Sequence, residues 1–280
     1  MKNILFSRAS VIFTIFMIAS PLALPDDQIH YSIYAGIYPP YLQEDNQGTT
    51  DIIIRKIFEA SDIQVDITHL PLKRLGKHYI GTNKVAGIYG VESLALSYAK
   101  KEKLLIGKPF QIGRFLFWYY KPNMKKKIKW NQFSDLKGYK ISVPLGSLLT
   151  QKLIDAGLDI DFASNTDAHI RKLVLKRASL APLFYFAATN MITKYYPEKM
   201  HEFGYLEKPI STTKFSLILN KGFHQAEKIM KHYHTGLNRI ITNGSYLKLL
   251  EELYGKGNIP KEYQELIFNK LNYTPDISYN

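Results

Sequence analysis

The sequence predicts an α/β protein composed of two units. Short runs of β-branched and aromatic residues alternate with stretches of helical apolar spacing from residue 31 onward, an order typical of parallel strands joined through helices. A Lys-Pro-Asn break at 121–123 is followed by a second series of the same kind. The 280 residues suffice for one large domain or for two of moderate size, each with its own core.

The first unit begins with a strand at 31–35, which ends in the aromatic loop Gly-Ile-Tyr-Pro-Pro-Tyr at 36–41. Polar residues at 48–51 provide an N-cap for a helix whose apolar residues recur at helical spacing over 52–58. Alternating polarity then predicts a strand at 64–70. A helix is expected to begin between Pro71 and Tyr79, and a buried strand is expected at 85–89.

An apolar strand is expected at 115–120, and it ends at the Lys-Pro-Asn break that precedes the second unit. A short helix from Phe133, a strand to Val143 and a helix through Leu158 are expected next. A further strand, helix and strand should run to about Thr189. A last strand at 215–220 precedes a long helical tail with five apolar positions on one face: Ile229, Tyr233, Leu237, Ile240 and Ile241.

Composition excludes several classes of function. The absence of cysteine excludes disulfide frameworks, thiolate zinc sites, iron–sulfur clusters, cysteine nucleophiles and lipid attachment to a cysteine. The 37 Lys and Arg against 24 Asp and Glu give a net charge of +13, but the one dense basic run, at 125–129, reads as a solvated loop rather than a nucleic-acid module. We expect no nucleic-acid partner, no metal site and no cofactor. Four histidines are expected on helix surfaces: His169, His224, His232 and His234.

The first 24 residues have the layout of a secretory signal peptide. A basic start is followed by a short apolar core and a small-residue exit. The apolar stretch is short for a membrane span of about 20 residues, although an uncleaved anchor is the alternative. We therefore expect a protein exported to the periplasm without lipidation, and most of its positive charge is ordinary surface.

Five strings stand out in sequence order: Tyr-Pro-Pro-Tyr at 38–41, Leu-Pro-Leu-Lys-Arg at 70–74, Lys-Glu…Pro-Phe at 101–110, Asp-Leu-Lys-Gly…Gly-Ser at 135–147 and Leu-Asn-Arg…Ser-Tyr at 237–246. Together they resemble the family 3 solute-binding proteins of bacterial ABC importers, the polar-amino-acid type. The resemblance implies a two-lobed α/β clamp of the periplasmic-binding-protein type II, with mostly parallel sheets and two crossing hinge strands. It places lobe 1 at 28–118 and 214–272 and lobe 2 at 119–213.

The resemblance also implies a function. A small-molecule ligand would be captured in the cleft by hinge closure and passed to an ABC permease in the inner membrane, by a monomeric protein without catalysis. The sequence departs from the family at the two positions that would bind the carboxylate and the ammonium group of an amino-acid ligand. Lys101 stands where the family has a carboxylate-binding arginine, and residues 183–185 lack the carboxylate that holds the ligand ammonium. We therefore expect a small polar or anionic solute that is amino-acid-like or aromatic.

Candidate ligand contacts follow from the motifs that the chain shares with the family. No residue is predicted to be catalytic. Tyr38 and Tyr41 are contacts or loop packing, Arg74 is a contact or part of an ion pair, and Glu92 is a contact or a helix cap. The full predicted set is Tyr38, Tyr41, Arg74, Tyr89, Glu92, Lys101, Ser147 and Tyr185.

Two other functions compete with solute delivery. Cyclohexadienyl-dehydratase-like enzymes resemble the same family, and Glu92 is the one visible acid or base for such chemistry. A sensor that reports ligand occupancy to a membrane partner would use the same clamp.

Overall fold

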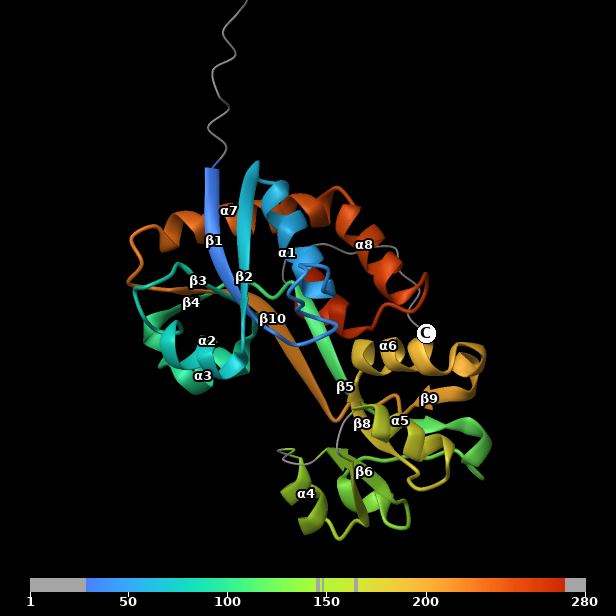
Figure 1. The fold of residues 1–280 in the computed structure, drawn as a ribbon. Helices are drawn as coiled ribbons and strands as arrows, with labels where there is room; N and C mark the ends of the chain where they lie inside the picture. Colours follow the sequence, from blue (N-terminus) through green and yellow to red (C-terminus); the bar gives the residue numbers. More distant parts are fainter. Residues whose placement is uncertain (1–28, 145–146, 148, 164–165, 270–280) are drawn as a thin grey trace, which may run out of the picture.

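A computed structural model describes residues 29–144, 147, 149–163 and 166–269. Two lobes are joined by two long strands (Figure 1). The predicted signal peptide at 1–24, and the outer ends of lobe 1 at residue 28 and at 270–272, lie outside the described residues.

Lobe 1 contains the parallel strands that the sequence predicts. Its strands lie in the order β2-β1-β3, and β1 pairs with β2 along its whole length. The helices between the strands confirm the predicted βαβ units. The strands are β1 (Ile29–Gly36), β2 (Ile63–Leu70) and β3 (Gly87–Val91), and the helices are α1 (Thr49–Glu59), α2 (Leu72–His78) and α3 (Glu92–Tyr98).

The two hinge strands are β5 (Gln111–Tyr120) and β10 (Ser211–Asn220). They pair antiparallel near the middle of the molecule, with Ser211 opposite Phe115. The far half of β10 pairs with β3 and β4 (Leu104–Ile106) in lobe 1, whereas the far half of β5 pairs with β8 (Ala181–Phe184) and β9 (Phe203–Tyr205) in lobe 2. Each strand therefore belongs to both lobes, and the resulting sheet is mixed rather than mostly parallel. The boundaries proposed at 118 and 214 fall inside these strands and remain predictions.

Lobe 2 has a second parallel pair, β6 (Ile141–Pro144) with β7 (Ile160–Ala163), and β6 also bridges to Leu180 in parallel. Its helices are α4 (Thr150–Asp155), α5 (Thr166–Val174) and α6 (Tyr185–Tyr195). The prediction of strand up to about Thr189 is wrong, because β8 ends at Phe184 and α6 begins at the next residue. The short apolar string there fits a buried strand and a buried helix equally well, so its periodicity could not locate the junction.

The described part of the chain also contains five short helical segments. They are η1 (Lys101–Lys103), η2 (Lys121–Asn123), η3 (Phe133–Leu136), η4 (Pro197–Glu202) and η5 (Gln264–Phe268).

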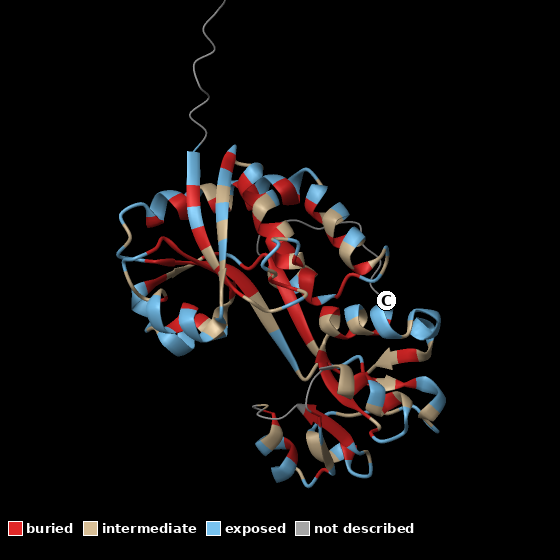
Figure 2. Cartoon of the chain, in the orientation of Figure 1, coloured by how far each residue is buried: buried red, intermediate tan, exposed pale blue. Residues whose placement is uncertain are grey.

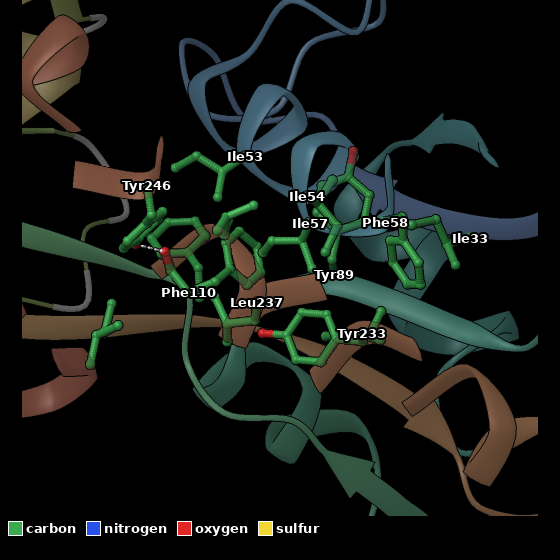
Figure 3. Close-up of a cluster of buried hydrophobic side chains, with 14 of the residues drawn as sticks. Ile33, Ile53, Ile54, Ile57, Phe58, Tyr89, Phe110, Tyr233, Leu237 and Tyr246 are labelled. Carbon is green, nitrogen blue, oxygen red and sulfur yellow. Dashed lines mark hydrogen bonds between the residues drawn. The ribbon is translucent and has the colours of Figure 1, made fainter. Parts of the chain in front are cut away.

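The C-terminal helices α7 (Ala226–Thr242) and α8 (Ser245–Tyr254) pack on lobe 1 and enclose its core (Figures 1 and 3). All five apolar positions predicted on the helical tail are buried. Helix α7 approaches α1 closely at Gly236, where an added Cβ would lie 1.8 Å from the carbonyl oxygen of Ile57. The core of lobe 1 therefore includes residues from both ends of the described chain.

His169 lies inside lobe 2, so the prediction that it occupies a helix surface is wrong. Its side chain is fully buried, and its Nδ1 lies 2.9 Å from the hydroxyl of Ser142, which is also fully buried. Burial and, to a smaller extent, the charge of Lys172 together lower the pKa of His169 to about 4. Among the other histidines, His224 is exposed, whereas His232 and His234 are half-buried.

The low pKa of His169 predicts that the protein loses stability in acid. A histidine that is buried neutral contributes stability above its unfolded pKa of about 6.5, and this contribution is lost as the pH falls towards 4. We expect the free energy of unfolding to fall by about 3 kcal/mol over this interval. In urea titrations at several pH values, His169→Gln should flatten this profile, whereas His224→Gln at an exposed site should not. An unchanged profile in His169→Gln would refute the assignment.

Within the described ranges, no helix is long and apolar enough to cross a bilayer. The same part of the chain holds no group of three or more His, Asp or Glu residues placed to bind a metal ion.

Candidate functional site

Five of the predicted site residues lie where parallel strands end. Tyr38, Arg74 and Glu92 follow the carboxyl ends of β1, β2 and β3, which are neighbours in lobe 1. Ser147 and Tyr185 follow the carboxyl ends of β6 and β8, which are linked in parallel in lobe 2. The carboxyl edge of parallel strands is the usual place for a ligand in α/β proteins.

The two carboxyl edges meet at an aromatic contact. Tyr38 of lobe 1 lies edge-on to Phe184, the last residue of β8, with ring centroids 6.1 Å apart. Phe184 also packs against Phe115 of the hinge strand β5, at 4.8 Å. Tyr38 is half-buried, and burial raises the pKa of its hydroxyl. It retains exposed surface for a further ring or apolar group.

Tyr41 is a core residue. Its ring is fully buried and stacks on Phe215 of β10 at 5.3 Å, and its hydroxyl accepts the backbone N–H of Phe186 at 3.4 Å. Burial raises its pKa well above the usual value. Because no surface of this side chain is open to a solute, the loop-packing interpretation applies to Tyr41. Its ring also stacks on Tyr38, at 5.9 Å, and so positions that residue.

Tyr89 is also buried, and its hydroxyl donates to the Oδ1 atom of Asp51 at 2.5 Å. Burial and the charge of Asp51 raise the pKa of Tyr89. Tyr89 is therefore a supporting residue rather than a surface that a solute could contact.

Asp51 anchors the loop that carries Tyr38. The carboxylate is fully buried and accepts four hydrogen bonds: from Tyr89, from His69 Nε2 at 3.2 Å, and from the backbone N–H groups of Gln43 and Gly48 at 2.9 and 3.1 Å. The sequence indicated Asp51 only as part of a helix start. Its contacts with strands β2 and β3 depend on distant parts of the chain, which local spacing does not reveal.

Glu92 begins α3 and is half-buried, and its Oε1 accepts a hydrogen bond of 2.5 Å from the hydroxyl of Ser216 on β10. The carboxylate thus lies beside a hinge strand at the carboxyl edge of lobe 1. Arg74 lies in the first turn of α2 with its guanidinium exposed, and it has no ion-pair partner within the described part of the chain. An unpaired guanidinium at this edge can bind a carboxylate or phosphate through two parallel hydrogen bonds.

Lys101 is not brought together with the other predicted residues. Strand β10 runs antiparallel to β3, so its carboxyl end lies at the amino end of β3. The carbonyl of Lys103 accepts the N–H of Lys221, just beyond β10, at 2.9 Å. Lys101 therefore lies at the opposite edge of lobe 1, about one strand length (roughly 13 Å) from Glu92. Counting along the family motif misplaced Lys101, because α3 carries the chain away from the carboxyl edge.

The two predicted residues of lobe 2 are both half-buried. The hydroxyl of Ser147 accepts the N–H of Leu149 at 3.2 Å, just before α4 begins. Tyr185 begins α6, and its ring contacts those of Tyr205 and Tyr254 at 5.9 and 5.4 Å. Burial raises the pKa of Tyr185.

Sequence reasoning missed a buried ion pair at the hinge. Arg114, in β5, places its Nε atom 3.2 Å from Oε1 of Glu262, and only 8% and 10% of the two side chains are exposed. Arg114 also donates from Nη2 to the carbonyl of Glu207 at 2.8 Å and lies 5.8 Å from the ring centre of Tyr205. This side chain therefore ties the C-terminal segment of the chain to the segment that leaves lobe 2. The available signal was Arg114 itself, the one charged residue in the strand Gln111–Tyr120. Because arginine is rarely buried unless it is paired, its position there predicts a buried partner.

The fold is shared with proteins of known structure. The L-cystine solute receptor of Neisseria gonorrhoeae, in an unliganded open conformation, is 17% identical with a TM-score of 0.61, over 83% of this chain and 95% of that one. An ancestral arginine-binding protein bound to arginine is 18% identical with a TM-score of 0.53, over 81% and 98% of the two chains. A histidine kinase sensor domain similar to periplasmic binding proteins is 16% identical with a TM-score of 0.55, over 81% and 97%.

No family profile and no curated protein sequence match the chain. The structural neighbours confirm the fold that the resemblance predicts, a two-lobed clamp of the periplasmic-binding-protein type.

Proposed function

We propose that this chain is an exported solute-binding protein. It holds a small polar or anionic solute between the carboxyl edges of its two lobes and closes on the solute by bending at β5 and β10. The observation that carries this proposal is the contact of Tyr38 with Phe184, which joins the two edges directly beside the hinge strands. Two lobes joined by two strands can rotate as units about the shared strands, with the aromatic contacts of Phe184, Tyr185 and Phe186 against lobe 1 beside the hinge.

The residues at these edges support a ligand class. Arg74 would bind an anionic group of the solute, and Glu92 a donor such as an ammonium or hydroxyl. The half-buried rings of Tyr38 and Tyr185 would flank an apolar or aromatic body, and Ser147 would supply a hydroxyl. Tyr41 and Tyr89 support this set from the core, and Lys101 lies outside it.

Delivery to an ABC permease in the inner membrane, from the periplasm and by a monomer, is the remaining part of the proposal. It is supported by the signal-like segment at 1–24 and by the fold shared with a solute receptor. We further propose that the protein has no catalytic activity and needs no cofactor. A sensor role is the second candidate, because a histidine kinase sensor domain has the same fold. Solute uptake by cells that lack the protein would separate these candidates, since only the importer role predicts reduced uptake.

The binding role predicts stabilisation by a solute. Thermal unfolding should be followed with the amino acids, cystine, aromatic acids and short peptides, each at millimolar concentration. A solute present at 100 times its Kd should stabilise the protein by about 2.7 kcal/mol. Arg74→Ala is expected to weaken the affinity for an anionic solute more than tenfold. Lys77→Ala, one turn further along α2 and equally exposed, should leave the affinity unchanged.

The absence of stabilisation by any member of the panel would contradict the binding role, and equal losses in the two variants would contradict the assignment of Arg74. Turnover of prephenate or arogenate that disappears in Glu92→Gln would establish the enzyme instead.

A further inference from the structure

Exposed lysines are frequent in and beside α2, α3 and η1 of lobe 1, a region in which much of the chain is exposed to solvent (Figure 2, pale blue). Each of them is exposed, and none forms an ion pair within the described ranges. Between residues 99 and 103, three lysines are accompanied by a single acidic residue, Glu102. We call this surface the α2–α3 basic face, and it consists of Lys73, Lys77, Lys100, Lys101, Lys103 and Lys221.

The basic face is continuous across the two helices. Lys73 and Lys77 are four residues apart on α2 and share one side of that helix. The ring of Tyr98, at the end of α3, lies against α2, where a Cβ added to Gly76 would be 2.3 Å from it. Beyond α2, a Cβ added to Gly81 would lie 4.0 Å from Cδ of Lys103. The backbone carbonyl of Lys103 accepts a hydrogen bond from the backbone N–H of Lys221. One unbroken surface therefore runs from α2 to the end of β10.

An exposed aromatic ring lies within this surface. Tyr98 of α3 is 39% exposed, and its ring lies against Gly76 of α2, the helix that carries Lys73 and Lys77. An aromatic side chain among lysines is typical of surfaces that rest on lipid headgroups, where the ring inserts and the lysines remain at the level of the headgroup phosphates.

We propose that the α2–α3 basic face docks on a membrane surface rich in anionic lipid. Its positive charges are mostly lysines, with Arg74 beside Lys77 on α2 and the acid Glu102 in η1, and lysine is depleted at protein–protein interfaces, where charges need fixed partners. Flexible ammonium groups can pair with the mobile phosphates of a membrane surface without a fixed geometry. Each ammonium group near the surface raises the affinity for an anionic membrane by roughly a factor of five. Lys103 and Lys221 lie at the amino end of β3, remote from the candidate solute site at the carboxyl edge, whereas Lys73 is next to Arg74.

Vesicle sedimentation tests the proposal directly. The protein should be mixed with large unilamellar vesicles of 30% phosphatidylglycerol in phosphatidylcholine, or of phosphatidylcholine alone, at 50 mM NaCl. We expect binding to the anionic vesicles only, and its loss at 500 mM NaCl because salt screens exposed charges. The triple variant Lys77→Glu/Lys100→Glu/Lys103→Glu should weaken the binding at least a hundredfold. Tyr98→Ser should weaken it severalfold without changing its dependence on salt.

The basic run of lobe 2 provides the matched control. Lys125→Glu/Lys126→Glu/Lys127→Glu makes the same change in net charge at exposed lysines on the other lobe, and it should weaken binding less than threefold. Equal losses in the two triple variants would overturn the assignment to α2 and α3. Failure of the unmodified protein to sediment with anionic vesicles would overturn membrane docking, and would leave an acidic protein as the partner of this face. Far-UV circular dichroism of each variant ensures that the loss of binding is not a loss of fold.

Discussion

Replacing Arg114 by methionine is expected to lower the free energy of unfolding by about 3–5 kcal/mol, the cost of leaving one member of a buried ion pair without its partner. Glu262 would retain a carboxylate with 8% residue exposure, and its Oε2 atom already makes no hydrogen bond within the described residues. Urea unfolding at pH 7 measures the change. Lys56→Met, which removes one partner of the exposed pair with Glu59, should cost less than about 1 kcal/mol.

A double variant gives this prediction a second test. When Arg114→Met is combined with Glu262→Leu, both charges are gone, and apolar groups of similar size occupy the same space. Such replacements are often neutral, so most of the stability lost in the single variant should return. If the double variant were as unstable as the sum of the two single variants, the pair would not be coupled, and its role in joining the hinge to the C-terminal segment would be refuted.

Replacing Asp51 by alanine is expected to cost about 4 kcal/mol and to weaken solute binding. The substitution removes the acceptor of four hydrogen bonds and leaves the Tyr89 hydroxyl and two backbone N–H groups without partners, at about 1–3 kcal/mol for each buried group left unsatisfied. Partial collapse of the site reduces the sum. Because the loop that carries Tyr38 loses its anchor, the affinity for the solute should fall together with the stability.

Asp45 lies in the same loop and provides the control for Asp51. Its carboxylate is exposed and accepts one hydrogen bond, from the N–H of Gln47, so Asp45→Ala should cost less than about 1 kcal/mol. Equal losses in the two variants, measured by urea unfolding, would show that the buried network does not hold the loop.

Local patterns predicted the elements that have long amphipathic sequences. The spacing in α1 and α7 and the alternation in β2 correspond to the observed elements, because each pattern directly reflects the face that the element buries. The same reasoning failed at Phe184 and Tyr185, where a strand passes into a helix within one apolar string.

The candidate site was less predictable because it depends on which strand ends become neighbours. Tyr38 and Glu92 follow strands with clear signals, and the structure brings them to one edge. Tyr41 and Tyr89 follow the same motifs, but they face inward, and the side on which a loop tyrosine packs is decided by distant partners such as Phe215 and Asp51. The location of Lys101 was inferred by counting residues along the family motif. A residue count does not show where a helix such as α3 leads the chain, so it could not place Lys101 in space.

The central claim is that the two lobes close on a solute. Because the chain has no cysteine, two introduced cysteines can be labelled without a background signal. Lys73→Cys on α2 and Lys152→Cys on α4 place fluorophores at exposed positions, one on each lobe, and Lys73→Cys with Lys248→Cys on α8 gives a reference pair within lobe 1. Titration with the solute panel should shorten the interlobe distance, as measured by energy transfer, for at least one solute, while the reference distance stays constant. An interlobe distance that no solute changes would contradict the account.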